Sequence, residues 1–265
     1  MSIFEAIVLG VIQGLTEFLP VSSSGHLVLL QKIFRISEPV LLFDTLLHLG
    51  TLAAVFVVLW QDIWNLLRKP IQRLTGFLIL ATIPLVIIAF LFKNKIEEAF
   101  SSAAYLGFAF LFTGGVLLVS DHLSRRSRKT KNEYTMHWLD ALIIGILQAI
   151  AIVPGISRSG STLSGALTCK LDRGLAARFS FLLSIPAILG ALALQLKDLF
   201  DGGTNIQITV TPYIAGTLTA GLVGFFSIKF MLKVVREHRL WGFALYVAVL
   251  GIAVLADQYG THIFF

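Results

Sequence analysis

Charged residues are scarce in this chain of 265 residues: Asp, Glu, Lys and Arg together make up only 14% of it. Soluble domains carry roughly a quarter charged residues, so this composition excludes an ordinary soluble protein. Hydrophobic residues account for 56%, and the mean hydropathy is +0.85. The chain is therefore predicted to be an integral membrane protein.

Cysteine and acidic residues are also rare. Cys169 is the only cysteine, which excludes an intrachain disulfide and leaves the redox compartment open. The net charge of +6 would fit a nucleic-acid-binding protein, but the basic residues lie in short loops between apolar segments, so no nucleic acid is expected as a partner. The apolar N-terminal stretch lacks the basic region and cleavage site of a secretory signal, and is not expected to be cleaved.

Six stretches are long and apolar enough to cross about 30 Å of hydrocarbon as helices. They cover residues 41–60, 74–92, 103–119, 179–196, 213–230 and 241–256. Lys and Arg are concentrated in three of the connecting loops, which are 61–73, 120–138 and 231–240. These loops are predicted to be cytoplasmic, which places both chain ends on the opposite side.

The second half of the sequence resembles the first at one fixed offset, the repeat offset, which aligns Glu5 with Asp140. "EAIVLGVIQ" from Glu5 is similar to "DALIIGILQ" from Asp140, and "GFAF" from Gly107 is similar to "GFAL" from Gly242. Chance similarity between apolar stretches is the alternative explanation. A single offset that holds from one end of each copy to the other favours an old duplication.

Each half then contains three spans and one interrupted segment, 3–35 in the first and 139–178 in the second. The odd number of crossings inverts the second copy. The predicted fold is an all-α polytopic membrane protein, one membrane domain over 1–265 made of two inverted repeats at about 1–125 and 136–265. It has six transmembrane helices and two re-entrant helical hairpins, whose breaks are expected to face one another near the bilayer midplane.

The first break lies in "EFLPVSSSGH", residues 17–26. Gln13 and Glu17 are four residues apart, which places them on one face of a helix that Pro20 helps to end. A polar loop of Ser22, Ser23, Ser24 and Gly25 then leads into His26, which begins a second short helix.

The second break follows Pro154 and Gly155 and is also polar, with Ser157, Arg158, Ser159, Gly160, Ser161 and Thr162. Hydroxyl groups and free backbone N–H groups at a helix N-terminus bind phosphate oxygens, and a guanidinium binds them in a bidentate manner. Glycine lets the backbone approach such a ligand closely. Both loops are therefore predicted to hold an anion.

For any single serine, helix capping or close packing is the favoured interpretation. Glu17 and Arg158 differ, because an ionisable group at membrane depth costs roughly 2.5 to 3.5 kcal/mol and usually has a function. A simple buried ion pair between them is the alternative. Asp44 and His48, on one face of the next span, are interpreted as lining a pore or supporting the site.

The repeat offset also shows how the halves differ. Glu17 aligns with Ile152, Ser23 with Arg158, and His26 with Ser161. A symmetric pore gains little from an acid and an imidazole in one half and an arginine in the other. The difference favours a single asymmetric catalytic site.

"EFLPVSSSGH" together with "PGISRSGST" resembles the bacterial undecaprenyl pyrophosphate phosphatase family, also called bacitracin resistance proteins. "FDTLLHLGT" from Phe43 and "RFSFLLSIPA" from Arg178 are similar as well, and the resemblance covers the whole chain. It implies an enzyme of the bacterial inner membrane that hydrolyses undecaprenyl pyrophosphate to the monophosphate and phosphate, with a divalent cation such as Mg²⁺ or Ca²⁺. Through lipid-carrier recycling it would confer bacitracin resistance, and the partners expected are the polyprenyl pyrophosphate, the bilayer and a second copy in a homodimer.

The family motif often has two glutamates four residues apart, whereas this chain has Gln13 in the first place. Glu17 is thus expected to be the metal ligand or the general base. Ser23 is the preferred nucleophile, activated by His26, with His26 itself as the alternative. Arg158 would hold the transferred phosphoryl group, and the remaining substrate contacts are expected from Gln13, Ser22, Ser24, Gly25, Ser157, Ser159, Gly160 and Thr162.

A transporter is the competing class, because inverted repeats with broken helices at the midplane are typical of secondary transporters. A flippase for the same lipid would need many of the same contacts. Release of phosphate by the purified protein distinguishes the two.

Overall fold

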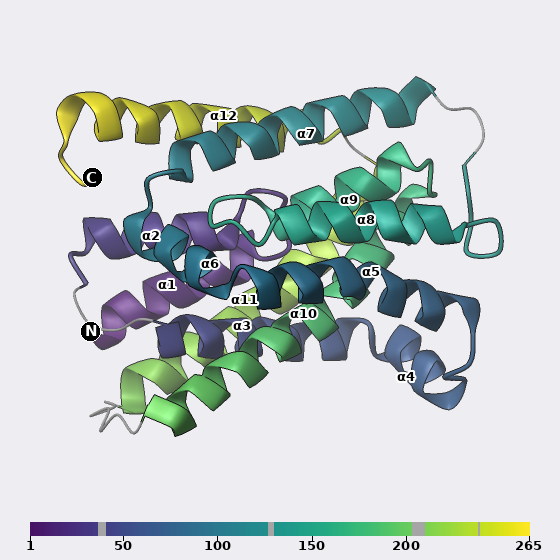
Figure 1. Cartoon of the computed structure of the whole chain (residues 1–265), viewed down its shortest axis with the longest axis horizontal. Helices are drawn as coiled ribbons and strands as arrows, with labels where there is room; N and C mark the ends of the chain where they lie inside the picture. Colours follow the sequence, from purple (N-terminus) through teal and green to yellow (C-terminus); the bar gives the residue numbers. More distant parts are fainter. Residues whose placement is uncertain (37–40, 127–129, 203–209, 238) are drawn as a thin grey trace.

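The computed structural model describes residues 1–36, 41–126, 130–202, 210–237 and 239–265 (Figure 1). Apart from one isolated bridge between Lys131 and Leu171, the regular secondary structure in these ranges is helical. The elements are α1 (Ile3–Thr16), α2 (Ser23–Ile33), α3 (Leu41–Val58), α4 (Trp60–Arg68), α5 (Arg73–Leu91), α6 (Lys93–Ser102), α7 (Leu106–Arg126), α8 (Trp138–Ile150), α9 (Arg158–Thr168), α10 (Arg173–Gly202), α11 (Val210–Glu237), α12 (Trp241–Ala256) and η1 (Asp257–Thr261).

Five helices in the described ranges are long and apolar enough to cross a membrane, namely α5, α7, α10, α11 and α12. α3 and α4, which are separated by one residue and bent by 78°, meet the same criterion as a pair, which brings the number of spans in the described ranges to as many as six. The chain is therefore a multi-pass, all-α membrane protein, and each of the six predicted spans corresponds to one of these helices. Several helices extend past the predicted limits, because a helix continues into the interface after its hydropathy has fallen.

The two interrupted segments form helical hairpins that enter from opposite ends of the molecule (Figure 1). α1 runs inward from the end that holds both chain termini, and α2 returns to it. α8 runs inward from the other end, and α9 returns there. In the second break Gly155 adopts a φ of +91°, a conformation that favours glycine.

The hairpins are packed tightly against long helices from the opposite half of the chain. A Cβ atom on Gly10 of α1 would lie 2.5 Å from the carbonyl oxygen of Gly216 in α11. One on Gly145 of α8 would lie 2.4 Å from that of Ala81 in α5. Small residues that let two backbones meet are the usual basis of helix association in lipid.

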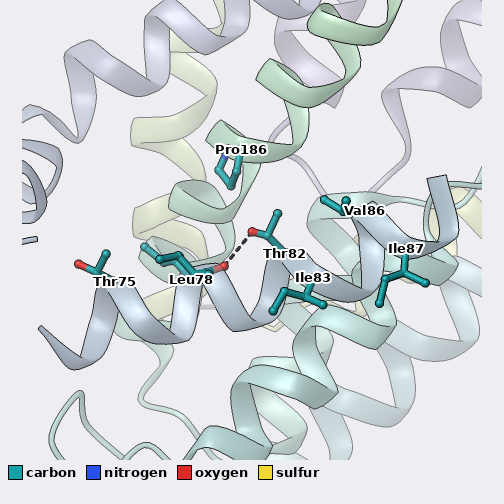
Figure 2. Close-up of a pocket in the computed structure, with 8 residues that line it drawn as sticks. Thr75, Leu78, Thr82, Ile83, Val86, Ile87 and Pro186 are labelled. Carbon is teal, nitrogen blue, oxygen red and sulfur yellow. Dashed lines mark hydrogen bonds between the residues drawn. The ribbon is translucent and has the colours of Figure 1, made fainter. Parts of the chain in front are cut away.

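A shallow apolar groove of about 380 Å³ runs along α5 beside α10 (Figure 2). It is lined by Thr75, Leu78, Ile79, Thr82, Ile83, Val86, Ile87 and Pro186. The Thr82 hydroxyl donates to the carbonyl of Leu78, so this residue contributes mainly its methyl group to the wall. With no ionisable side chain in its lining, this groove suits a hydrocarbon chain and not an anion.

Candidate active site

The tips of the two hairpins meet inside the molecule, which confirms the prediction that the two breaks face one another. The Ser159 hydroxyl of the second hairpin donates to the carbonyl of Leu19 in the first, at 2.9 Å. An ion pair joins Arg158 to Glu17. A Cβ atom on Gly25 would lie 3.1 Å from the Cα of Gly155, so the loops touch through backbone.

Glu17 is the centre of this junction, buried at the end of α1. One carboxylate oxygen, Oε1, pairs with Arg158. The other, Oε2, accepts a 2.6 Å hydrogen bond from the Ser23 hydroxyl and a 3.0 Å bond from the Gln13 amide, and lies 3.4 Å from Nε2 of His48. Three predicted site residues thus converge on one carboxylate, and His48 joins them.

Arg158 is the first residue of α9, at the helix end where the dipole is positive. One terminal nitrogen pairs with Glu17. The other, Nη1, is buried without a hydrogen-bond partner in the protein. The ion pair that served as the alternative interpretation does exist, but it leaves a buried cationic donor free, which is costly unless a ligand uses it.

The serines at the helix starts serve partly as caps. Ser22 accepts from the N–H of Gly25 at the start of α2, and Ser157 accepts from the N–H of Gly160 at the start of α9. The repeat offset aligns the two caps with each other. For Ser22 and Ser157 the structure therefore provides the structural role of a helix cap.

Other predicted substrate contacts also have partners within the protein. The Thr162 hydroxyl donates to the carbonyl of Arg158 and lies 2.6 Å from that of Ser180. Ser24 makes only long contacts, at 3.4 Å, with the Ser22 hydroxyl and the N–H of Gly155. Of the polar side chains expected to bind substrate, Gln13 is the one that the structure places directly on Glu17.

The structure does not bring His26 to Ser23, contrary to the expected activation of one by the other. Nδ1 of His26 lies 2.7 Å from the carbonyl oxygen of Ser22, and Nε2 lies 2.8 Å from the hydroxyl of Tyr246. The Ser23 hydroxyl instead points to Glu17. Both ring nitrogens of His26 thus face groups other than the Ser23 hydroxyl, namely the Ser22 carbonyl and the Tyr246 hydroxyl.

From the sequence, His48 was interpreted as lining a pore or supporting the site, and the structure places its Nε2 3.4 Å from Glu17. Asp44, its neighbour one turn earlier, accepts a 2.8 Å hydrogen bond from Gln31 and supports α3 against α2. Tyr246 was missed entirely. It lies in a lipid-facing stretch of α12, where one tyrosine in an apolar helix gives no signal of its own.

Fold and site together define a polytopic helical membrane protein with a buried polar site between two helical hairpins. The chain belongs to the family described as bacitracin resistance protein BacA, which matches residues 6–253. It is 47% identical over 259 residues to the undecaprenyl-diphosphatase of Carboxydothermus hydrogenoformans, covering 97% of this chain and 98% of that one. It is 46% identical to undecaprenyl-diphosphatase 4 of Bacillus thuringiensis over the full length of both, and 43% identical to the undecaprenyl-diphosphatase of Halothermothrix orenii over 96% of this chain and 98% of that one.

Proposed function

We propose that this chain is a membrane phosphatase that hydrolyses undecaprenyl pyrophosphate to undecaprenyl phosphate and inorganic phosphate. In the bacterial inner membrane this reaction returns the lipid carrier to cell-wall synthesis and confers resistance to bacitracin. The observation that carries the proposal is the Ser23 hydroxyl at 2.6 Å from Glu17, with Arg158 on the other carboxylate oxygen. Family membership supports the same reaction. The predicted homodimer is retained as part of this proposal.

Hydrolysis of a pyrophosphate needs a nucleophile, a proton acceptor and a positive group on the phosphoryl oxygens. Ser23 Oγ attacks the terminal phosphorus while its proton passes to Glu17. The bond from that phosphorus to the bridging oxygen breaks, and undecaprenyl phosphate leaves. Water then cleaves the phosphoserine to release inorganic phosphate and restore the serine. The free Nη1 of Arg158 and the N–H groups at the start of α9 hold the phosphoryl oxygens during both steps.

A divalent cation is part of the proposal. Among the described residues no group of three or more His, Cys, Asp or Glu side chains is arranged to hold a metal ion. Glu17 and the amide oxygen of Gln13, which has no hydrogen-bond partner, could still hold an ion whose other ligands are substrate oxygens and water. That donor set suits Mg²⁺ better than Ca²⁺, which takes six to eight oxygens. When bound, the cation would neutralise negative charge on the pyrophosphate.

The polyprenyl tail must lie on the membrane-facing surface, since the site itself is polar. The groove beside α5 is a hollow of suitable chemistry on that surface (Figure 2). α10 connects it to the site, because Phe181 packs edge-on against Phe18, next to Glu17, and Pro186 lines the groove. We place part of the tail there.

The test is phosphate release by purified protein in detergent, with undecaprenyl pyrophosphate and Mg²⁺. A detergent solution has no compartments, so a carrier would release nothing, and absence of phosphate with wild-type protein would contradict the proposal. Ser23→Ala should lower turnover by roughly a hundredfold or more. Ser124→Ala, at the far end of α7, is the matched control and should retain normal turnover. Addition of a chelator tests the cation, whose role is excluded if turnover persists.

A further inference from the structure

The imidazole of His26 is held from two sides. The carbonyl oxygen of Ser22 can only accept a hydrogen bond, so Nδ1 of His26 carries a proton. In the neutral ring, Nε2 then accepts from the hydroxyl of Tyr246. The two rings are stacked, with centroids 5.7 Å apart and an interplanar angle of 12°, while Phe110 meets the imidazole edge-on. Both position and tautomer of His26 are therefore fixed.

The same histidine supports the backbone that presents the nucleophile. Ser22 has a φ of +71°, a conformation that side-chain-bearing residues rarely adopt. Its carbonyl is fixed by His26, its hydroxyl caps α2, and the next residue is Ser23. A contact that holds His26 therefore also holds the Ser23 hydroxyl toward Glu17.

We propose that Tyr246 is a positioning residue for the reaction: through His26 and the backbone of Ser22, its hydroxyl fixes Ser23 against Glu17. This inference rests on the proposed function. His26 accordingly holds the backbone of Ser22 in place and does not act as nucleophile or base. We call the linked pair of His26 and Tyr246 the brace. The contact links α2 to α12, two helices 220 residues apart at this point.

The brace belongs to one half of the molecule only. Under the repeat offset His26 aligns with Ser161 and Tyr246 with Leu111. A pair kept merely to dock the last helix of each repeat would be expected in both halves. Its presence beside Ser23 alone associates it with the chemistry.

Tyr246→Phe is the direct test, because it keeps the stacked ring and removes only the hydroxyl. Turnover, kcat, should fall by about tenfold, the usual scale of one lost hydrogen bond, while KM and the melting temperature stay near wild type. Tyr105→Phe, on the exposed turn before α7, should change none of the three. Unchanged kcat in Tyr246→Phe, or a fall explained by a lower melting temperature, would overturn the inference and leave the proposed function standing.

A second measurement does not depend on activity. In protein labelled with ¹⁵N-histidine, comparison with His26→Gln identifies the ring signals of His26. Tyr246→Phe should shift its Nε2 signal and leave those of the other five histidines in place. An unmoved signal would show that the hydroxyl does not hold the ring, whether or not the protein hydrolyses the substrate.

Discussion

Glu17 receives groups from four parts of the chain: Gln13 on its own helix, Ser23 after the break, His48 on α3, and Arg158 from the other half. A carboxylate buried in this way depends on its partners for stability as well as for chemistry. Removing one member of a buried ion pair typically costs about 3 to 5 kcal/mol, because the other charge is left unpaired. Substitutions that test the chemistry must therefore keep charge or shape.

Arg158→Lys keeps the charge and loses the planar fork of the guanidinium. If Arg158 holds the phosphoryl oxygens in the transition state, kcat should fall by roughly a hundredfold or more, with a melting temperature near that of the wild type. Arg178→Lys is the matched control, since Arg178 also pairs with a carboxylate, Asp62, but outside the site. Wild-type phosphate release by a stable Arg158→Lys protein would return Arg158 to a purely structural role.

For single residues, the sequence identifies ionisable side chains at membrane depth, but it does not identify contacts made by common residues. Glu17 and Arg158 could be identified because a charge at membrane depth needs a reason. The contact between His26 and Tyr246 could not, since it depends on how α12 lies beside α2 and involves a common aromatic residue. The pairing of Ser23 with Glu17 instead of His26 depends on side-chain directions, which spacing alone does not determine.

Among the elements, the six spans followed from hydropathy, and the two hairpins from the polar residues and prolines that interrupt the helices. The bend between α3 and α4 was not predicted from the sequence. No proline or glycine lies at Leu59 or Trp60, and the chain turns where an apolar helix gives way to an amphipathic one. Trp60 and Trp64 stack on each other there, and Arg68 lies over Trp64, as expected for a helix in the membrane interface.

Glycine contacts between helices give a prediction about stability. Gly145→Ala would place a methyl group 2.4 Å from the carbonyl oxygen of Ala81, so α8 and α5 must separate. Overpacking of this kind costs about 1 to 3 kcal/mol, and the melting temperature in detergent should fall by several degrees. Gly115→Ala on α7 is the control, since a Cβ there meets nothing within 4 Å, and it should melt at or above the wild-type temperature. Equal melting temperatures for the two variants would contradict the assigned packing.

Across the whole molecule, each half packs one helix of its hairpin against a long helix of the other half. α1 of the first half packs on α11 of the second, and α8 of the second packs on α5 of the first. Under the repeat offset these two contacts correspond. The correspondence supports our proposal that the chain is a duplication with an inverted second copy, at about 1–125 and 136–265. Weak similarity in the sequence could suggest the repeat, but not that its halves interlock.

The distribution of Lys and Arg predicts the orientation in the membrane. Ile71 precedes α5 on the expected cytoplasmic side, and Asn94 follows it on the other. In a Cys169→Ser background, Asn94→Cys should react with an impermeant thiol reagent on intact cells, and Ile71→Cys only after lysis. The buried Cys169 should contribute little labelling even without its replacement. Labelling in the reverse order would show that the molecule has the opposite orientation in the membrane, with the same fold.

The ion pair between Glu17 and Arg158 also sets an order of events during synthesis. The two residues are 141 positions apart, so at about 5 to 20 residues per second the ribosome makes the first roughly 7 to 30 seconds before the second. α11, against which α1 packs, is made later still. For that interval the first hairpin has neither its counter-charge nor its neighbour, and Glu17 is costly to insert. A chain truncated before α11 lacks the neighbour of this hairpin, and membrane proteases should degrade it faster than the full chain.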